Sequence, residues 1–370
     1  MNPVNTRARR SLQPTSLIGF AIVHLCALGV IGVGFSWQGV LLCIGSYYLR
    51  MFGVTAGFHR YFSHRAFRLN RFWQFVLAFL AMTSAQKGVL WWASNHRHHH
   101  RYSDEPEDIH SPVQDGFYWS HIGWILAPQP AGTDFSRIPD LAKYPELRRL
   151  DKNQYVPTLL YAVALTLAFG PAGLFYGYFL ATVLLWHGTF AINSVMHVFG
   201  KRVFDTTDDS RNSMIFALLT MGEGWHNNHH HHPGSAAQGF RWWQIDMTYY
   251  GLVLLEKVRI VQSMNRVPER LRKSARALVQ TSVDQLAARW ASMRASVELA
   301  RHDALAELEE KRLATVARLE ALQAEYNAAI ARAGKATSRR VAELRAEIEQ
   351  ARQQLAAVLE HLIETAQAPA

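Results

Sequence analysis

Residues 37–64 read WQGVLLCIGSYYLRMFGVTAGFHRYFSH, an apolar run that ends in two histidines, His59 and His64. A helix needs about 20 mostly apolar residues to cross a bilayer, and Trp37–Phe58 reaches that length with one charged residue, Arg50. The stretch therefore predicts a membrane helix that carries two histidines to one face of the membrane.

Three more apolar stretches extend this pattern. Ser16–Phe35 precedes the first with almost no loop between them, and a second pair, Tyr155–Phe169 and Ala172–Ser194, is separated only by Gly170-Pro171. Short connections favour antiparallel neighbours. We therefore predict an all-α integral membrane protein with four transmembrane helices in two hairpins, beneath a cytosolic helical cap.

The segment Phe72–Trp92 is apolar too, but polar residues interrupt it at Gln74, Thr83, Ser84, Gln86 and Lys87. We expect a helix that caps the bundle or lies at the membrane interface, not a full span.

Basic residues orient the predicted spans. Lys and Arg outnumber Asp and Glu by 39 to 29, an excess that suits an anionic membrane surface beside apolar spans better than nucleic acid. Basic residues precede the first span and flank the end of the second: Arg7, Arg9, Arg10, Arg50, Arg60, Arg65, Arg68 and Arg71. The positive-inside rule then places both termini, residues 59–154 and everything after 195 in the cytoplasm.

The first span is not expected to be a cleaved signal peptide, because Ser16–Phe35 is too long and lacks a small-residue cleavage site. Cys26 and Cys43 both lie in apolar runs, so a disulfide framework is not expected.

The last hundred residues have a different composition. Seven apolar residues alternate in steps of three and four, as in a coiled-coil seam: Val341, Leu344, Ile348, Ala351, Leu355, Val358 and Leu362. A less regular version runs from Leu305 to Ile330, and Gly334–Ser338 separates the two. We divide the chain into a basic segment 1–15, a membrane domain 16–260 and a helical extension 268–370. The extension is either a solvated appendage or a surface for self-association or partner docking.

Four histidine clusters carry the chemistry. Residues three and four apart share a helix face, so His96, His99 and His100 can present three imidazoles to one small volume, and so can His226, His229 and His230. Asn193 and His197 share a face in the same way. His59 and His64, five apart, lie about 140° apart on an ideal helix, so we expect the helix to end or bend between them.

Nine imidazoles exceed what one ion needs and suit two. We interpret His24 and His187 as ordinary core histidines, and we leave His98, His231 and His232 out because they lie off the repeating pattern. A poly-histidine run can bind metal incidentally, but four clusters on one predicted side of the membrane favour a built site. His232-Pro-Gly-Ser is similar to a haem-binding loop, but the surrounding chain is already committed to the metal site.

Three of these motifs resemble the histidine boxes of the membrane acyl-CoA desaturases of the stearoyl, delta-9 type, closest to their bacterial branch. They are His-Arg-Tyr-Phe-Ser-His at 59–64, His-Arg-His-His-His at 96–100 and Gly-Glu-Gly-Trp-His-Asn-Asn-His-His at 222–230. Asn193 with His197, Thr55-Ala-Gly and Ser120-His-Ile-Gly-Trp124 strengthen the resemblance, which covers about residues 16–255.

The resemblance implies two iron ions in a bacterial inner-membrane protein that uses O2 and two electrons to desaturate a fatty acyl chain, with a ferredoxin-, rubredoxin- or cytochrome-type donor. It implies nine ligands, with Asn193 acting through a water: His59, His64, His96, His99, His100, His197, His226, His229 and His230.

The resemblance also implies a narrow bent tunnel for the acyl chain. Gln86, Thr189 and Phe190 match its bend-forming positions, and Trp92 matches as well; for Phe190 and Trp92 plain core packing is the alternative. Tyr47 lies on the same predicted helix face as His59, and we expect it near the closed end of the tunnel, where it would limit chain length.

Two departures concern the head group of the substrate. Ser94-Asn95 and Gln114-Asp115 stand where the animal enzymes have Arg-Asp and basic residues that receive CoA. A CoA thioester is the leading expectation, with phospholipid and carrier-protein esters as alternatives. The competing functions are a related membrane hydroxylase and a non-enzymatic metal-binding membrane protein, although transporters usually place polar ligands near the bilayer midplane.

Overall fold

In the computed structural model, which describes residues 12–128, 132–273, 275–333 and 339–367, three helical stretches are long and apolar enough to cross a membrane. The first joins α2 (Pro14–Ala27) to α3 (Val30–Val33), and the second joins α4 (Trp37–Phe52) to a π-helix, η1 (Gly53–Ser63). The third contains α11 (Val156–Ala172), the π-helix η4 (Gly173–Leu180), α12 (Ala181–Ser194) and the short 3-10 helix η5 (Val195–His197).

The third stretch folds back on itself. Its 42 residues would form a rod of about 63 Å if straight, twice the hydrocarbon thickness of about 30 Å. Gly170 breaks it with φ 58° and ψ −145°, and Pro171 follows. Beyond this turn, a Cβ added to Gly173 would collide with the carbonyl oxygen of Leu165. The segments on either side of Gly170 therefore pack against each other.

The outer helices present apolar side chains to their surroundings. Ile31 is 77% exposed, Leu41 67% and Leu167 82%, whereas half of the most apolar part of Trp37–Ser63 is buried inside the protein. Apolar surface of this extent is expected where lipid is the solvent. Arg7, Arg9 and Arg10, used above to orient the spans, lie outside the described residues.

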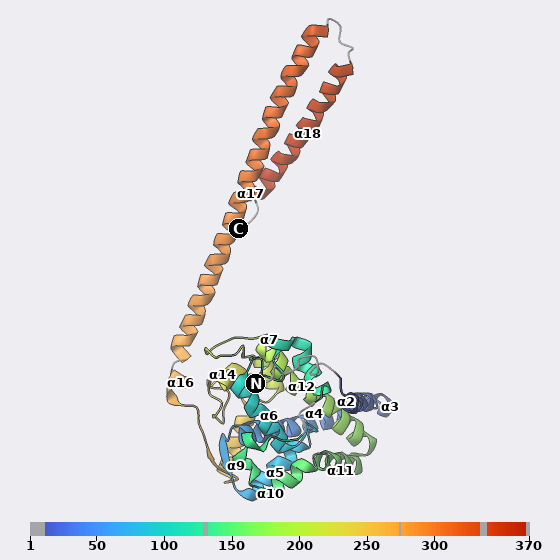
Figure 1. The fold of residues 1–370 in the computed structure, drawn as a ribbon, viewed down its shortest axis with the longest axis vertical. Coiled ribbons are helices and arrows are strands. Elements are labelled where there is room, and N and C mark those ends of the chain that lie inside the picture. The colour runs from blue at the N-terminus through green and yellow to red at the C-terminus, as the bar shows by residue number, and fades with distance from the viewer. Residues whose placement is uncertain (1–11, 129–131, 274, 334–338, 368–370) are drawn as a thin grey trace. The chain divides into compact units, whose positions relative to one another are not determined.

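The remaining elements of the first unit pack with these helices in one compact body (Figure 1). The segment between the second and third stretches contains α5 (Arg71–Met82), α6 (Val89–Tyr102), α7 (Pro112–Asp115), the π-helix η2 (Trp119–Gly123), α8 (Trp124–Leu126), the 3-10 helix η3 (Phe135–Arg137), α9 (Pro139–Ala142) and α10 (Pro145–Lys152). After the third stretch come α13 (Met214–Leu219), α14 (His226–His231), α15 (Met247–Lys257) and α16 (Glu269–Lys273).

α5 agrees with the expectation of a helix that does not span. Asn70 caps its N-terminus by accepting a hydrogen bond from the Trp73 amide at 2.9 Å, and its 12 residues reach about 18 Å. The all-α prediction missed one small sheet: β1 (Phe67–Leu69) pairs antiparallel with β2 (Val261–Met264). This pairing ties the chain just after His64 to the segment that follows α15.

η1 lies at the centre of the core. Phe58, Tyr61 and Phe62 are at most 1% exposed, and they belong to a buried cluster that also takes in Met82 and Leu90. The helix packs against both α5 and α6, so the start of the cap is fixed on the end of a membrane helix.

The chain divides into compact units at Ala275, a few residues beyond the predicted start of the extension. The second unit consists of α17 (Ala275–Ala333) and α18 (Arg339–Gln367). Every predicted seam residue of α18 is buried or half-buried, including Leu344 and Ile348, while most residues between them are exposed. The predicted break Gly334–Ser338 lies outside the described residues.

Substituting Gly173 tests the fold-back at Gly170. We expect Gly173→Ala to destabilise the protein by about 1–3 kcal/mol, because the added methyl group meets backbone that cannot move aside. The measurement is the thermal unfolding midpoint in detergent. Gly45→Ala is the matched control, since nothing lies within 4 Å of a Cβ at that membrane-helix position; equal midpoints for the two variants would contradict the packing.

Candidate metal centre

The π-helix brings His59 and His64 together. The His64 amide donates to the carbonyl of His59 at 3.2 Å, an i to i+5 bond that places residues five apart nearly one above the other. The two rings have centroids 4.9 Å apart. The helix does end between these histidines, as expected, because η1 stops at Ser63. Its π-helical widening nevertheless directs both side chains to one side.

The two histidine trios are each divided between two places. His96 and His100 of α6 lie with His59 and His64, while His99 points to the other side; in α14, His226 and His230 lie together while His229 joins the first set. The prediction that each trio serves one small volume was too simple. Residues at i+3 and i+4 differ by about 100° around a helix, so a trio between two sites contributes to both.

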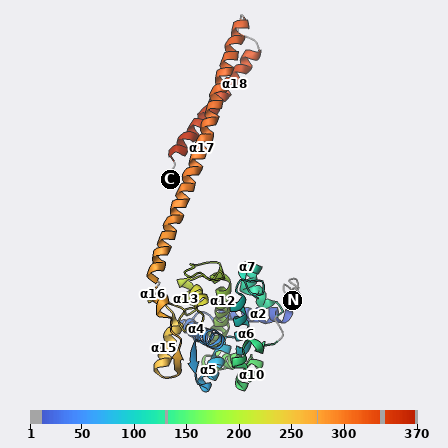
Figure 2. The same ribbon diagram turned by 60° about the vertical axis from the view of Figure 1, so that its left-hand side comes forward.

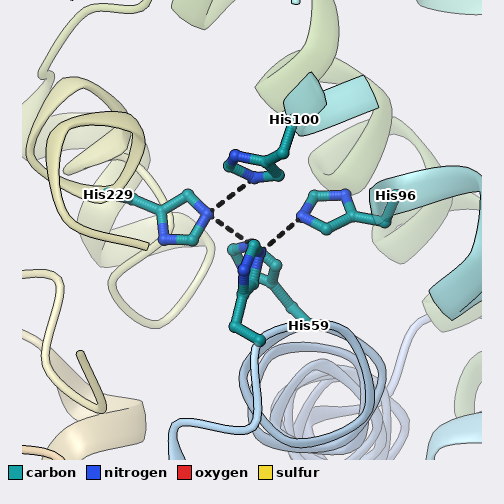
Figure 3. Close-up of side chains that lie close together, drawn as sticks. His59, His96, His100 and His229 are labelled. Atoms are coloured by element: carbon teal, nitrogen blue, oxygen red, sulfur yellow. Dashed lines mark hydrogen bonds between the residues drawn. The ribbon is translucent and has the colours of Figure 1, made fainter. Parts of the chain in front are cut away.

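All nine predicted histidines fall into two groups whose nitrogens lie within 4.8 Å of one another. Group A is His59, His64, His96, His100 and His229, and group B is His99, His197, His226 and His230. Figure 3 shows four members of group A, from η1, α6 and α14, turned toward one another. Helices far apart in the sequence therefore converge on two adjacent points.

The nitrogen positions fit metal ions. The Nε2 atoms of His59 and His229 are 2.9 Å apart, those of His64 and His96 are 3.0 Å apart, and those of His197 and His226 are also 3.0 Å apart. Two nitrogens each about 2.0–2.1 Å from one ion can have this separation. The Nε2 atoms of His99 and His230 are buried without a hydrogen-bond partner within the described chain, as expected of nitrogens directed at an ion.

Four of the imidazoles contact carboxylates through Nδ1, and the sequence analysis did not select these carboxylates. His59 Nδ1 contacts Glu223, His99 Nδ1 lies 2.9 Å from Asp108, His197 Nδ1 2.8 Å from Asp104 and His230 Nδ1 2.5 Å from Asp208. A carboxylate on the far nitrogen fixes the tautomer and the ring orientation of a metal-binding histidine.

The pKa values of the carboxyl groups reflect the same contacts. Burial would raise the pKa of Asp108 and of Asp208, but their histidine partners keep both pKa values far below the usual range. Glu223 was quoted within a motif without a role, and the three aspartates lie in loops where no helical or strand periodicity marks them. The one feature of the sequence that could have pointed to these acidic residues is that they lie close in the chain to the histidine motifs.

For six of the nine histidines the surroundings lower the pKa and so favour the neutral imidazole, the form that binds metal. Burial, followed by repulsion from neighbouring histidines, keeps the pKa well below its usual value for His64, His96, His100, His226 and His229. Burial lowers the pKa of His230 to about 4, although Asp208 opposes the shift. For His99, burial also acts to lower the pKa, but Asp108 and further carboxylates outweigh it and raise the value.

His110 is a tenth histidine at this centre that the sequence analysis did not select. It is buried, its ring centroid lies 4.4 Å from that of His99, and burial lowers its pKa to about 3. Of the three excluded residues in the runs, His98 meets the carbonyl of Glu107 at 3.0 Å and His231 stacks on Phe204. His98, His231 and His232 belong to neither group.

An apolar cavity of about 650 Å³ adjoins group A. Its wall includes His96, and Trp92 stacks on the His96 ring with centroids 4.7 Å apart. Four of the five predicted substrate residues line it, namely Gln86, Trp92, Thr189 and Phe190, and so does Asn193. Its volume is within the usual range for a small-molecule site, and it connects the predicted substrate positions with a predicted metal ligand.

The loop that carries Gln86 is held in an unusual conformation. Ala85 and Lys87 on either side have φ of 58° and 72°, a region that non-glycine residues adopt at a cost of about 1–3 kcal/mol. Gln86 Nε2 donates to Thr189 Oγ1 at 3.1 Å, and Trp186 Nε1 donates to the Ser84 carbonyl at 2.9 Å. These bonds fix the loop to α12 across the cavity.

Tyr47 does not line this cavity. Its hydroxyl donates to the carbonyl of Leu219 at 2.7 Å, and its ring packs beside Cys43 and Tyr176. Its side chain turns toward α13, and the expectation that Tyr47 closes the tunnel stays a prediction. Thr158, Tyr178 and Trp186 line the cavity among the membrane helices instead.

His24 and His187, which we interpreted as ordinary core histidines, form hydrogen bonds with each other and with a third histidine. His24 Nδ1 lies 2.8 Å from the Phe20 carbonyl, and the Nε2 atoms of His24 and His187 are 3.1 Å apart. His187 Nδ1 is 3.1 Å from His121 Nε2, and His121 Nδ1 is 2.9 Å from Ser194 Oγ. This histidine chain links α2, α12 and η2 beside the cavity, which the sequence analysis did not anticipate.

The fold and the site together define a helical membrane protein that gathers nine histidines in metal-sized groups next to an apolar cavity. The chain matches the fatty acid desaturase family over residues 35–254, more than half its length, and it belongs to that family. The predicted resemblance is thereby confirmed. The family match ends before the helical extension begins.

Similar proteins act on different acyl carriers. The chain is 34% identical over 262 residues to the sn-2 palmitoyl-lipid 9-desaturase of Nostoc sp. (strain 36), covering 70% of this chain and 92% of that protein. It is 34% identical over 273 residues to the sn-1 stearoyl-lipid 9-desaturase of Synechocystis sp., covering 72% and 85%. It is also 36% identical over 244 residues to the Acyl-CoA C20 Delta5-desaturase of Anemone leveillei, covering 65% and 77%.

Asp208→Asn tests whether the carboxylates support metal binding. We expect metal affinity to fall about 10- to 100-fold, because His230 loses the charged partner that fixes its tautomer. Metal retained per chain after dialysis against a graded chelator series is the measurement. Asp205→Asn is the matched control from the same loop, since the Asp205 side chain is fully exposed. Equal metal retention in both variants would disprove the supporting role.

Proposed function

We propose that this protein is an oxygen-dependent delta-9 acyl desaturase that holds two iron ions, one in each histidine group. The observation that carries the proposal is the division of nine buried or half-buried histidines into groups of five and four beside an apolar cavity. Asn193 lies one helical turn before His197 on α12 and would complete group B through a water. Bound iron supplies the oxygen activation that removal of hydrogen from an unactivated methylene pair requires.

The chain's own residues place the substrate. Trp92 joins the cavity wall to His96 by stacking, so an acyl chain in the cavity passes beside group A. The Gln86–Thr189 hydrogen bond fixes one section of the wall, and the apolar lining around it keeps water from the chain. We propose that this section determines which methylene pair lies next to the metal ions.

We also propose four membrane crossings, with the third apolar stretch crossing twice. The broken backbone at Gly170 and the contact of Gly173 with Leu165 support a hairpin. His59 and His197 then lie at the inner ends of spans two and four, on the cytoplasmic side that the basic residues favour.

Product analysis in a host without its own delta-9 desaturase tests the reaction. We expect a double bond in the fatty acids of cells that express the chain, and loss of both product and iron in His226→Ala. His98→Ala, which alters a histidine outside both groups, should keep both. Mass spectrometry of derivatised fatty acids locates the bond. An alcohol product would indicate a hydroxylase, and zinc without any oxygen-dependent product would indicate a metal-binding protein.

A second cavity favours a substrate with an anionic head group. It has a volume of about 890 Å³ and shares Gln13, Lys87 and Trp91 with the acyl cavity. Four basic side chains line it: Lys87, Arg148, Arg149 and Lys152. Among the described residues that line it, Asp151 carries the one carboxylate. This group already accepts hydrogen bonds from the Leu90 amide at 2.8 Å and from Thr133 Oγ1 at 2.7 Å. Positive charge therefore remains for a phosphate-bearing head group, as in CoA or a phospholipid.

Removing two of these charges tests the head-group proposal. Arg149→Ala combined with Lys152→Ala should raise KM by roughly 5- to 30-fold and leave kcat unchanged, because exposed charge contacts contribute about 0.5–1 kcal/mol each. Assays with stearoyl-CoA, a phosphatidylglycerol and a neutral galactolipid distinguish the carriers. Lys143→Ala, outside the cavity lining, is the control. Equal turnover of the galactolipid, or an unchanged KM, would refute the proposal.

A further inference from the structure

Part of the wall of the acyl cavity is made of residues that are exposed on two membrane helices. One face of α2 contributes Thr15, Gly19 and Val23, spaced four apart, and of these Thr15 and Gly19 are exposed. At the start of α11, Tyr155 and Leu159 line the same cavity and are 65% and 59% exposed. A closed cavity would bury all the residues that line it. This cavity therefore has a lateral opening, edged by Thr15 and Gly19 on α2 and by Tyr155 and Leu159 on α11.

The surface around the lateral opening is apolar. Ile18 and Ile22 on α2, and Leu160 and Val163 on α11, are each more than half exposed. Both helices belong to stretches that are long and apolar enough to cross a membrane. Lipid tails are the solvent for such a surface. The lateral opening therefore faces the acyl chains of the bilayer.

Behind the lateral opening, the cavity continues along α12 to the metal centre. α2 lies beside α12 in both views (Figures 1 and 2), and Phe20 stacks on Trp186 with ring centroids 5.8 Å apart. Trp186 is buried, and it lines the cavity together with Asn193 and His96. One continuous space thus joins the exposed Gly19 to a histidine of group A.

The basic cavity described above lies next to the same helix ends. It shares Gln13, which directly precedes α2, with the acyl cavity, and its lining residues between Arg148 and Gln154 lead into α11. Both helices begin on the cytoplasmic side in the proposed four-span arrangement. A lipid of the inner leaflet would therefore meet the basic side chains with its head group and the lateral opening with its acyl chains.

We propose that an acyl chain of an anionic phospholipid enters the cavity sideways from the inner leaflet, through the lateral opening, with its phosphate in the basic cavity. The inference rests on the function proposed above, since it needs the cavity to hold an acyl chain. Exposing a long acyl chain to water is costly, because each methylene group gains free energy from leaving water. A sideways route keeps the chain in an apolar medium throughout, so the substrate stays in the bilayer.

Photolabelling of the full chain in phosphatidylglycerol vesicles tests this route. The probe is a phosphatidylglycerol with a diazirine midway along one acyl chain, and mass spectrometry locates the label. Label on Trp186, which is buried from the surrounding lipid, reports a chain inside the cavity. Label on Leu167, which is exposed on α11 and lines neither cavity, is the internal reference. We expect both residues to be labelled in the wild-type chain.

Filling the lateral opening from either side should exclude the probe. Gly19→Trp and Leu159→Trp should each lower the label on Trp186, relative to that on Leu167, by roughly 10-fold, because the added indole occupies the space that the chain needs. Nothing lies within 4 Å of a Cβ placed at Gly19, so the fold accepts the first of these variants.

Each variant has a matched control. Gly32→Trp alters another exposed glycine of the same membrane stretch, where nothing lies within 4 Å of an added Cβ. Leu160→Trp alters the exposed neighbour of Leu159, and neither Gly32 nor Leu160 lines a cavity. Both controls should keep the label on Trp186.

Undiminished label on Trp186 in both Gly19→Trp and Leu159→Trp would overturn the lateral route, and so would a wild-type chain labelled at Leu167 alone. An equal loss of label in the controls would overturn it too, because the loss would then not depend on the opening. Irradiation under argon prevents turnover, so the result is independent of the reaction. A chain that forms double bonds but takes no label in the cavity would exclude this route and leave the proposed function intact.

Discussion

The pairing of buried carboxylates with imidazoles is the interaction on which the centre of this protein depends. Nine imidazole rings can share a small volume only if each is held in one orientation, and four of them are held by acidic side chains. The Asp104 carboxylate binds more than its histidine partner. One of its oxygens meets His197 and the Asp209 amide, at 2.8 Å and 2.9 Å, and the other accepts from Ser111 at 2.6 Å. A single carboxylate thus joins the end of a membrane helix to two cap loops.

The π-helix at the end of the second apolar stretch orients two of the histidines, His59 and His64. A membrane helix that continued as an α-helix would direct His59 and His64 to different sides, and one of them would leave the centre. Widening by about one residue per turn keeps both on one side up to the end of the helix at Ser63. Arg60 lies between them and pairs with Asp246 at 2.9 Å and with Glu223 at 3.1 Å. The wide turn is thereby joined to the segment that carries α14.

Features that follow from a regular spacing of residues along a helix could be predicted from the sequence. Features that depend on contacts between distant segments could not. Long apolar runs indicated the membrane helices, and helix periodicity marked the two histidine trios and His197. His59 and His64 do not fit that periodicity, and the resemblance of their motif to a histidine box selected them. The division of each trio depends on where α6 and α14 lie relative to each other, which no local pattern contains. The four carboxylates reach the histidines from loops, and Tyr47 turned away from the cavity although it shares the predicted face of His59. Each of these outcomes is decided by tertiary contact.

The hydrogen bonds of the histidine chain beside the cavity all run in the same direction, from donor to acceptor. The Phe20 carbonyl can only accept, so His24 must donate to it from Nδ1 and accept at Nε2 from His187, which in turn accepts from His121. If all three rings are neutral, Ser194 must donate to His121. Its single hydrogen can also turn to the Phe190 carbonyl, 3.0 Å away, and His121 would then keep both of its contacts only with a hydrogen on each nitrogen. The orientation of one hydroxyl, next to Asn193 in the sequence, is therefore coupled to the positions of the hydrogens on the three rings.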